Sequence, residues 1–463
     1  MKNVLLIDFG STYTKLTAVD IDKQKILGTA SSYTTIETDI NDGLNNGLKI
    51  LESKIGKTEF SECYACSSAA GGLRMITSGL VPELTGEAAR LASLGAGAKV
   101  VGVYAFELTD DDLKEIEKAK PDIFLLVGGT DGGNTECILH NAKELAKIKP
   151  AFPIIIAGNR TATKECKNIL KDFEVYVCPN VMPKFGELKI EETQKQIREI
   201  FLNRIIRAKG LSKATQLLSD ILMPTPAAVL QAVELLAKGF EDEKGIGELI
   251  AVDVGGATTD IYSIADGMPE HMNTVYKGLP EPYAKRTVEG DIGMRYSIQG
   301  VIDIAGINKI STLSGLSPEV ILELVEDLKQ NTDKIPNENN QIEALDFALA
   351  SCAVDEAVTR HAGTISESFT LLGKVLVQEG KNLTGVKNIV VTGGSLIHSK
   401  RLTEIAQHAL YSAEKPSSLR PTNADVWADK KYILAAMGLL SSHYPQIALN
   451  IMKKELEHYG DTK

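Results

Sequence analysis

Apolar residues occur along the chain in short, uninterrupted runs, and most of these runs end in glycine, serine, threonine or aspartate. Residues 4–7 form the first such run, and residues 249–252 form a later one of the same length. Continuous apolar runs of this length predict strands that are buried on both faces of a sheet. The polar residues that follow each run predict tight turns at the strand ends.

A different pattern fills the chain from about residue 75 to residue 209. Strand-like runs at 99–103, 122–127 and 153–157 alternate with stretches of helical periodicity. Such alternation predicts a small parallel sheet with helices on its faces. We therefore predict an inserted α/β subdomain in this part of the chain.

The insertion divides the rest of the chain into two parts. We predict a first half formed by residues 1–74 and 210–240, the inserted subdomain at 75–209, and a second half at 241–463 with a helix near 424–440. A chain of 463 residues is long enough for several such bodies, each with its own core.

The strand run at 249–252 leads into a turn that begins at Asp253 and ends at Asp260. Gly255 and Gly256 let the backbone turn tightly with its N–H groups exposed, and Thr258 adds a hydroxyl donor. Two carboxylates repel a lone phosphate, but they suit a phosphate that is accompanied by Mg²⁺, which is held through its water shell. Taken alone, the same residues also fit an ordinary hairpin with a Gly-Gly turn.

The first strand run leads into a similar turn. Asp8 is followed by Gly10, Ser11 and Thr12, and this copy ends in Lys15 where the later copy ends in an aspartate. Two such turns predict two related halves that face each other across a cleft, with the nucleotide phosphates between them. The first aspartates of the two turns are then the carboxylates on the metal side.

These motifs resemble the phosphate motifs of the sugar kinase, heat-shock-70 and actin ATPases. Residues 389–395 resemble the adenosine motif of that superfamily, and residues 226–232 and 435–438 resemble its two interdomain helices. The resemblance covers nearly the whole chain and implies a duplicated ribonuclease-H-like, actin-like ATPase fold that binds ATP and Mg²⁺. It assigns catalysis to Asp8, Asp253 and Asp260, and it gives Asp8 and Asp253 to Mg²⁺ through water. The ATP-binding residues that it implies are Gly10, Ser11, Thr12, Lys15, Gly255, Gly256, Thr258, Gly393, Gly394 and Ser395.

Composition narrows the classes of function. The hydrophobic content of 43% and the charged content of 24% are those of an ordinary globular protein. A net charge of −11 argues against a nucleic-acid surface. The six cysteines at irregular spacing, the absence of a signal peptide and the absence of a membrane-spanning run predict a cytoplasmic protein.

Two further motifs allow two interpretations each. Cys63 and Cys66 are spaced as in metal or redox sites, but no second cysteine or histidine pair completes a zinc site, so buried structural thiols are the alternative. The glycine-rich loop at 128–134 falls at a predicted strand end. The loop is either a second anion site or a tight strand-to-helix turn. It lacks the lysine of a P-loop.

The insertion and three segments, at 67–72, 129–134 and 287–295, resemble one branch of the superfamily. This branch is the MutL-type accessory protein of adenosylcobalamin-dependent glutamate (methylaspartate) mutase, which is unrelated to the mismatch-repair protein of similar name. The resemblance implies an ATP-dependent reactivating factor or chaperone that releases damaged cobalamin, with the mutase subunits as partners. The cobalamin motif Asp-x-His-x-x-Gly is absent, so the corrinoid is expected on the partner.

One residue departs from the superfamily pattern. Heat-shock-70-type members have a glutamate before the proline of the first interdomain helix, and Thr225 stands there in this chain. We therefore expect slow ATP hydrolysis. The alternatives are a small-molecule kinase with Asp260 as its base, a reactivase of another cobalamin aminomutase, and an actin-like filament.

Overall fold

The structure, a computed structural model, describes residues 2–10, 13–34, 40–68, 73–208, 220–270, 273–332, 334, 340–370 and 373–461. The chain forms two compact units, and each is described by itself. The first comprises Met1–Ala232, Gly278–Pro282 and Leu434–Ile451, and the second comprises Val233–Lys277, Tyr283–Ile433 and Met452–Lys463.

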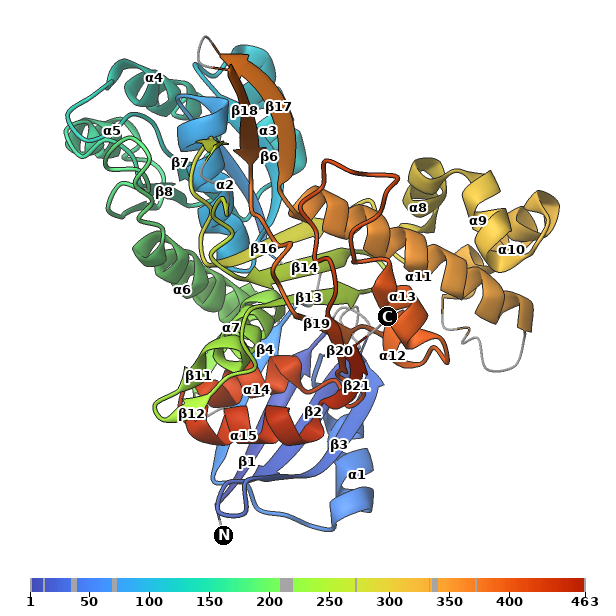
Figure 1. Cartoon of the computed structure of the whole chain (residues 1–463). Helices are drawn as coiled ribbons and strands as arrows, with labels where there is room; N and C mark the ends of the chain where they lie inside the picture. The colour runs from blue at the N-terminus through green and yellow to red at the C-terminus, as the bar shows by residue number, and fades with distance from the viewer. Residues whose placement is uncertain are drawn as a thin grey trace. The chain divides into compact units, whose positions relative to one another are not determined.

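A five-stranded sheet forms the first half, in the order β10-β4-β1-β2-β3 (Figure 1). Its strands are β1 (Asn3–Phe9), β2 (Tyr13–Asp20), β3 (Lys25–Tyr33), β4 (Glu62–Ser67) and β10 (Asp220–Pro224). The first three strands are antiparallel to one another, whereas β4 runs parallel to β1 and β10 runs parallel to β4. Helix α1 (Ile40–Ile55) packs on β2 and β3.

The second half repeats this topology. Its sheet has the order β16-β14-β13-β19-β20-β21, with β13 (Leu249–Val254), β14 (Thr259–Ile264), β16 (Ala284–Glu289), β19 (Asn388–Thr392), β20 (Asp425–Ala428) and β21 (Glu457–Asp461). Three antiparallel strands are again followed by two parallel ones. The predicted duplicated ribonuclease-H-like fold is therefore confirmed.

A long helix, α11 (Asn340–His361), lies against β13 and β14 of this second sheet (Figure 1). Most of its residues are buried, which is expected of a helix that is apolar around most of its circumference.

The predicted inserted subdomain is a separate parallel sheet in the order β6-β5-β7-β8-β9. Its strands are β5 (Arg74–Gly79), β6 (Lys99–Ala105), β7 (Ile123–Leu126), β8 (Ile154–Ile156) and β9 (Val175–Val177). The helices that alternate with them are α2 (Glu87–Gly95), α3 (Asp110–Ala119), α4 (Glu136–Leu145) and α5 (Thr163–Ile169), and α6 (Glu191–Ala208) follows.

One hydrophobic core joins the insertion to the first half. Leu5 and Ile7 of β1 belong to the same buried cluster as Ile123 of β7, Ile155 of β8 and Ile200 of α6. A shared core makes the first half and one face of the inserted sheet a single packed body.

The remaining elements complete the chain. They are a π-helical turn at Pro82–Gly86, α7 (Thr225–Lys238), β11 (Gly239–Phe240), β12 (Glu243–Lys244), β15 (Thr274–Lys277), α8 (Ile298–Ala305), α9 (Ile307–Ser314), α10 (Pro318–Gln330), β17 (Thr364–Thr370), β18 (Gly373–Glu379), α12 (Gly394–Ile397), α13 (Leu402–Gln407), α14 (Leu434–Ser441) and α15 (Pro445–Glu455). Among the residues that the structure describes, none of the helices has the length and apolar character needed to span a bilayer.

Candidate nucleotide site

The first predicted phosphate turn joins β1 to β2. The backbone N–H of Gly10 donates to the carbonyl of Tyr13 at 3.1 Å, and Asp8 stands opposite Lys15 in the strand pairing. A Cβ atom on Gly10 would lie 2.5 Å from the Tyr13 carbonyl oxygen, so the turn requires glycine. Ser11 and Thr12, which the resemblance assigns to ATP, lie outside the described residues.

The second turn joins β13 to β14 and is closed by an equivalent hydrogen bond. The N–H of Gly255 donates to the carbonyl of Thr258 at 2.9 Å, and Asp253 stands opposite Asp260. A Cβ atom on Gly255 would lie 2.9 Å from the Thr258 carbonyl oxygen. Each half therefore ends its first strand in an aspartate that precedes a tight turn closed by glycine.

Two side chains hold the Asp8 carboxylate within the first unit. Thr225, the first residue of α7, donates from Oγ1 to Asp8 Oδ1 at 2.6 Å, and the Cys66 thiol donates to the same oxygen at 3.5 Å. Burial, and after it the negative charge of Asp8, raises the pKa of the Cys66 thiol well above its usual range, which keeps it protonated and able to donate. Both contacts use Oδ1, so they fix the orientation of the carboxylate.

Cys66 and the other cysteine of the Cys-x-x-Cys spacing, Cys63, are on one strand. Cys63 and Cys66 both lie in β4, both are buried, and neither is in a disulfide. Burial raises the pKa of Cys63 to about 12. A thiol that stays protonated is a poor nucleophile and a poor metal ligand, so the structure favours the interpretation as buried thiols.

The predicted adenosine motif lies beside the second aspartate. Thr392 at the end of β19 stands opposite Asp253, and the next residue, Gly393, has a φ of +97°. A Cβ atom on Gly393 would lie 2.4 Å from the carbonyl oxygen of Val254 and 2.9 Å from Asp253 Oδ1. Gly394 and Ser395 then form the start of α12. The structure thus brings the residues that resemble the adenosine motif and the Asp253 carboxylate together at one end of the second sheet.

Sequence reasoning did not find Tyr432 at this end of the sheet. A Cβ atom on Gly394 would meet the Tyr432 hydroxyl at 2.9 Å, and the backbone of Tyr432 has a φ of 54°, which is unusual for a residue other than glycine. Burial, and after it the charges of Asp253 and Asp429, raises the pKa of Tyr432, so its phenol is protonated. No local sequence pattern around residue 432 predicts that Tyr432 lies next to Gly394, because only the folded backbone brings the two residues together.

Asp260, the third predicted catalytic carboxylate, forms a buried ion pair. Arg286 on β16 approaches Asp260 Oδ1 at 2.6 Å from Nη2 and at 2.8 Å from Nε. The Thr258 hydroxyl donates to the other oxygen at 3.4 Å. Arg286 thus neutralises this carboxylate, which counts against a role as a free base, and its catalytic assignment stays a prediction.

The segment after β16 forms backbone hydrogen bonds to the second turn. The backbone N–H of Met294 donates to the Gly255 carbonyl at 3.0 Å, and those of Arg295 and Tyr296 donate to the Gly256 carbonyl at 2.9 and 2.8 Å. The Arg295 guanidinium is itself bound by both oxygens of Asp346, at 2.9 and 2.8 Å. This stretch, which includes the end of the segment at 287–295 that resembles the accessory-protein branch, therefore positions the turn.

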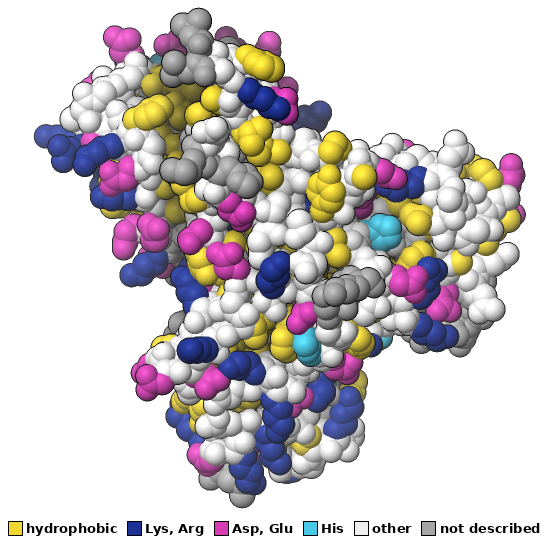
Figure 2. All heavy atoms as spheres, in the orientation of Figure 1, with side chains coloured by type: hydrophobic (Ala, Val, Ile, Leu, Met, Phe, Trp, Pro, Cys, Tyr) yellow, Lys and Arg dark blue, Asp and Glu magenta, His cyan; other side chains and the backbone are white. Residues whose placement is uncertain are grey.

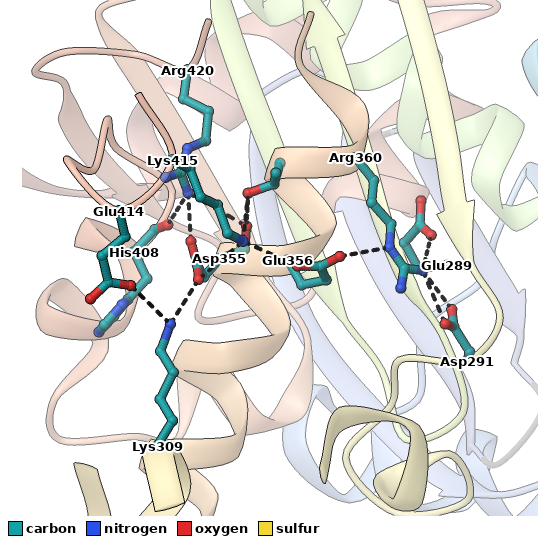
Figure 3. A network of polar contacts seen from close by, with 11 residues as sticks. Glu289, Asp291, Lys309, Asp355, Glu356, Arg360, His408, Glu414, Lys415 and Arg420 are labelled. Atoms are coloured by element: carbon teal, nitrogen blue, oxygen red, sulfur yellow. Dashed lines mark hydrogen bonds and ion pairs between the residues drawn. The ribbon is translucent and has the colours of Figure 1, made fainter. Parts of the chain in front are cut away.

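A network of charges ties that segment to α11 (Figure 3). Arg360 on α11 donates to Glu289 at 2.8 Å and to Asp291 at 3.0 Å, on either side of the end of β16. One turn earlier on α11, Asp355 accepts from the fully buried Arg420 at 2.7 Å and pairs with Lys415 at 3.3 Å. Figure 3 shows these side chains converging on the helix from both sides. Through Arg360, α11 holds the segment after β16 that contacts the second turn.

The charge on Asp355 gives the packing of α11 against Arg420 and Lys415 a pH dependence. Burial raises its pKa, but the Arg420 bond and the neighbouring Lys415 and Lys309 charges outweigh burial, and the pKa is lowered. We expect Asp355→Asn to reduce the free energy of unfolding at neutral pH by about 1.5–3 kcal/mol, the contribution of a hydrogen bond between charged groups.

A group whose pKa is lowered by folding contributes stability above its unfolded pKa of about 4, and this contribution is lost as the pH falls through the lowered value. Urea unfolding from neutral pH to about pH 3 should therefore show the gap between the unaltered protein and Asp355→Asn narrowing below about pH 4. The exposed Asp303→Asn on α8 serves as the control. A gap of constant size would show that the Asp355 charge does not stabilise this region.

The described carboxylates fit a site for hydrated Mg²⁺ better than a metal site made entirely of protein ligands. Within the described ranges, no group of three or more His, Cys, Asp or Glu side chains is placed to hold a metal ion. Mg²⁺ keeps several of its waters and takes one or two carboxylates together with phosphate oxygens. Asp8 in the first half and Asp253 in the second half each offer a ligand of this type, and their assignment to Mg²⁺ stays a prediction.

Comparisons with known proteins agree with the motifs. The sequence matches the MutL protein family over residues 4–456. Protein MutL of Clostridium tetanomorphum is 46% identical over 460 residues, which cover 98% of this chain and 99% of that one.

Two solved structures are similar across most of the chain. Ligand-bound xylulose kinase from Lactobacillus acidophilus has 11% identity and a TM-score of 0.37, with 100% of this chain and 93% of that chain covered. The activator of the 2-hydroxyisocaproyl-CoA dehydratase from Clostridium difficile with bound ADPNP has 8% identity and a TM-score of 0.34, with 98% and 95% covered.

Proposed function

The chain belongs to the MutL family, and on that basis we propose that it is an ATP-dependent reactivating factor, or chaperone, for an adenosylcobalamin-dependent glutamate mutase in the cytoplasm. It binds Mg-ATP and releases damaged cobalamin from the mutase. The observation that carries the ATP part of the proposal is the repeated turn, with Asp8 and Asp253 at the same place in two sheets that share five strands in the same order.

In this proposal the two turns hold the phosphates of one nucleotide. The N–H groups of the turns and the Thr258 hydroxyl donate to phosphate oxygens, and the two aspartates hold the hydrated Mg²⁺. The adenosine lies beside Gly393 and Gly394, and Val254 and Tyr432 fill the space into which side chains at these two positions would project. Asp8 and Asp253 would hold the hydrated Mg²⁺, which would supply compensation for the phosphate charge and help to orient the attacking water.

Nucleotide state then controls the mutase. Loss of the γ-phosphate removes contacts and shifts the population toward an open conformation. A switch from mostly open to mostly closed needs about 5.5 kcal/mol of differential binding. Because the insertion shares a hydrophobic core with the first half, it moves with that half and transmits the change to the mutase.

The test uses mutase that has been inactivated by turnover and still holds damaged cobalamin. Adding this protein with Mg-ATP and fresh adenosylcobalamin should restore mutase activity and release the damaged corrinoid into a filtrate. ADP or a non-hydrolysable ATP analogue should not restore it. Phosphorylation of a sugar in a parallel panel, without reactivation, would instead establish the kinase alternative.

The hydroxyl of Thr225 provides a prediction about the first turn. Thr225→Val keeps the side-chain shape but removes the donor that holds Asp8, so we expect the affinity for Mg-ATP to fall by about tenfold, which corresponds to roughly 1.4 kcal/mol. Thr225→Ser retains the hydroxyl and should remain close to the unaltered protein. Titration calorimetry with Mg-ATP measures both, and an affinity of Thr225→Val equal to that of the unaltered protein would show that this hydrogen bond does not support nucleotide binding.

A further inference from the structure

The inserted sheet has a hollow of about 510 Å³ at the carboxyl ends of β8 and β9. Its lining includes Asp131, Arg160, Val177, Asn180, Pro183 and Lys189. We call it the carboxyl-edge hollow. The loops that form it follow β7, β8 and β9, and these are the loops on which parallel α/β sheets carry their binding sites.

Two buried side-chain amides hold these loops in place. Asn159, which is fully buried, donates to the carbonyls of Gly133 and Asn134 at 3.1 Å each and accepts from the N–H of Gly132 at 3.1 Å. The backbone groups of the glycine loop at 128–134 that bond to Asn159 are therefore used within the fold. This favours the interpretation of the loop as a tight turn over that of a second anion site.

Asn180 connects a third loop to the same structure. Its amide donates to the Gly129 carbonyl at 3.0 Å and to Asp131 Oδ1 at 3.1 Å, and the N–H of Arg160 donates to the same oxygen at 3.0 Å. A satisfied network of buried polar groups fixes one arrangement of the loops, and a preformed surface loses less entropy on binding.

The loop after β5 closes on itself at the usual ligand position of such a sheet. That position is the switch point between β5 and β7, where the strand order reverses. There, Thr85 Oγ1 accepts from the N–H groups of Leu80 at 2.7 Å and Val81 at 3.1 Å, and a Cβ atom on Gly79 would lie 2.5 Å from the Gly86 nitrogen. The N–H groups of Leu80 and Val81 are therefore already used within this loop.

The rim of the hollow is basic although the protein is acidic. Residues 158–189 contain six lysines and arginines and four acidic residues, in a chain of net charge −11. The side chains of Arg160 and Lys189 are 79% and 60% exposed, and each has an acidic neighbour: Arg160 Nε lies 3.9 Å from Asp131 Oδ2, and Lys189 Nζ lies 3.0 Å from Glu187 Oε1. In Figure 2, dark blue Lys and Arg side chains gather at the outer left, over the region that α5 occupies in Figure 1.

An exposed aromatic residue stands beside this basic rim. Phe185 is 78% exposed and lies in a turn closed by pairing of Lys184 with Glu187, between the lining residues Pro183 and Lys189. Val177, in the lining itself, is 46% exposed. Exposed aromatic and basic residues on a preformed surface are typical of the residues that dominate protein–protein binding.

We propose that the carboxyl-edge hollow and Phe185 form a docking surface for a protein partner that presents an acidic side chain flanked by apolar residues. The acidic side chain enters between Arg160 and Lys189, and the apolar residues cover Phe185 and Val177. The charge of the rim selects this partner chemistry. The identity of the partner as a mutase subunit rests on the proposed function.

The experiment measures binding of purified mutase subunits to the immobilised full chain, with ATP, with ADP and without nucleotide. Two variants test the surface: Phe185→Ser and the double variant Arg160→Glu/Lys189→Glu. Their matched controls are Phe369→Ser, which is 79% exposed in β17, and Lys114→Glu/Lys118→Glu on α3 of the same insertion.

Phe185→Ser should weaken binding by about tenfold or more, mainly through faster dissociation. The double charge reversal should slow association, and the effect should be larger at low salt. Both control variants should stay within about threefold of the unaltered protein, since residues outside an interface contribute little. All four should bind Mg-ATP normally, because none lies in either turn.

The outcomes separate this inference from the proposed function. If Phe185→Ser and the double reversal both bind the mutase like the unaltered protein, the docking surface is wrong while the function stands. If the unaltered protein binds no mutase subunit in any nucleotide state, the proposed function and the partner are both wrong.

Discussion

Asp8→Asn and Asp253→Asn should each weaken Mg-dependent ATP binding by about 10–100-fold while the fold stays intact, as expected when a group that orients a bound metal is changed. Asparagine has the shape of aspartate but lacks the negative charge that holds hydrated Mg²⁺. In Asp8→Asn the amide oxygen still accepts from Thr225, whose hydroxyl lies 2.6 Å from Asp8 Oδ1, so the local structure should persist. Titration calorimetry with ATP, with and without Mg²⁺, measures the effect, and circular dichroism monitors the fold.

The repeated topology supplies matched controls. Asp22 lies at the end of β2 away from the first turn, and Asp266 follows β14 at the corresponding end of the second sheet, and both are exposed. Asp22→Asn and Asp266→Asn should bind Mg-ATP like the unaltered protein. Unchanged affinity in both Asp8→Asn and Asp253→Asn would remove the assignment of the two turns to the nucleotide.

Most of the fold could be predicted from the sequence, because continuous apolar runs indicate the strands and glycines indicate the turns. Both phosphate turns were expected because a buried strand, an aspartate and a glycine follow one another within a few residues. The inserted parallel sheet was expected because its strands and helices alternate along the chain. In each case the signal is local, and it survives in the folded protein because the same residues form both the pattern and the element.

The contacts within the candidate site were not accessible in this way. Thr225 bonds to Asp8 across 217 positions of the chain, and Arg286 pairs with Asp260 across 26. Sequence reasoning treated Thr225 only as the replacement of a glutamate, and it treated Asp260 as a free carboxylate. Hydrogen bonds between distant segments leave no periodic trace, so the partner of a polar group depends on the strand register that only the fold defines.

The buried pair of Asp260 and Arg286 carries the second prediction of large effect. The Arg286 side chain is 3% exposed and that of Asp260 is 12% exposed, so each charge depends on the other for its stability in the interior. Arg286→Met removes one partner and leaves the Asp260 charge buried and uncompensated. We expect the free energy of unfolding to fall by about 3–5 kcal/mol, as measured when buried ion pairs are broken. Urea unfolding followed by circular dichroism measures this change.

A second substitution separates the lost charge pair from lost packing. The double variant Asp260→Leu/Arg286→Met replaces both charges by apolar side chains, and it should recover much of the stability lost in Arg286→Met, because replacing a buried ion pair by packed hydrophobic residues is often close to neutral. If Arg286→Met is as stable as the unaltered protein, Asp260 is not held by this pair in solution and is free to act as a base, as the kinase alternative requires. If the loss occurs and is recovered in the double variant, Asp260 serves to hold β14 and β16 together beside the second turn, and the metal-side charge at that turn comes from Asp253.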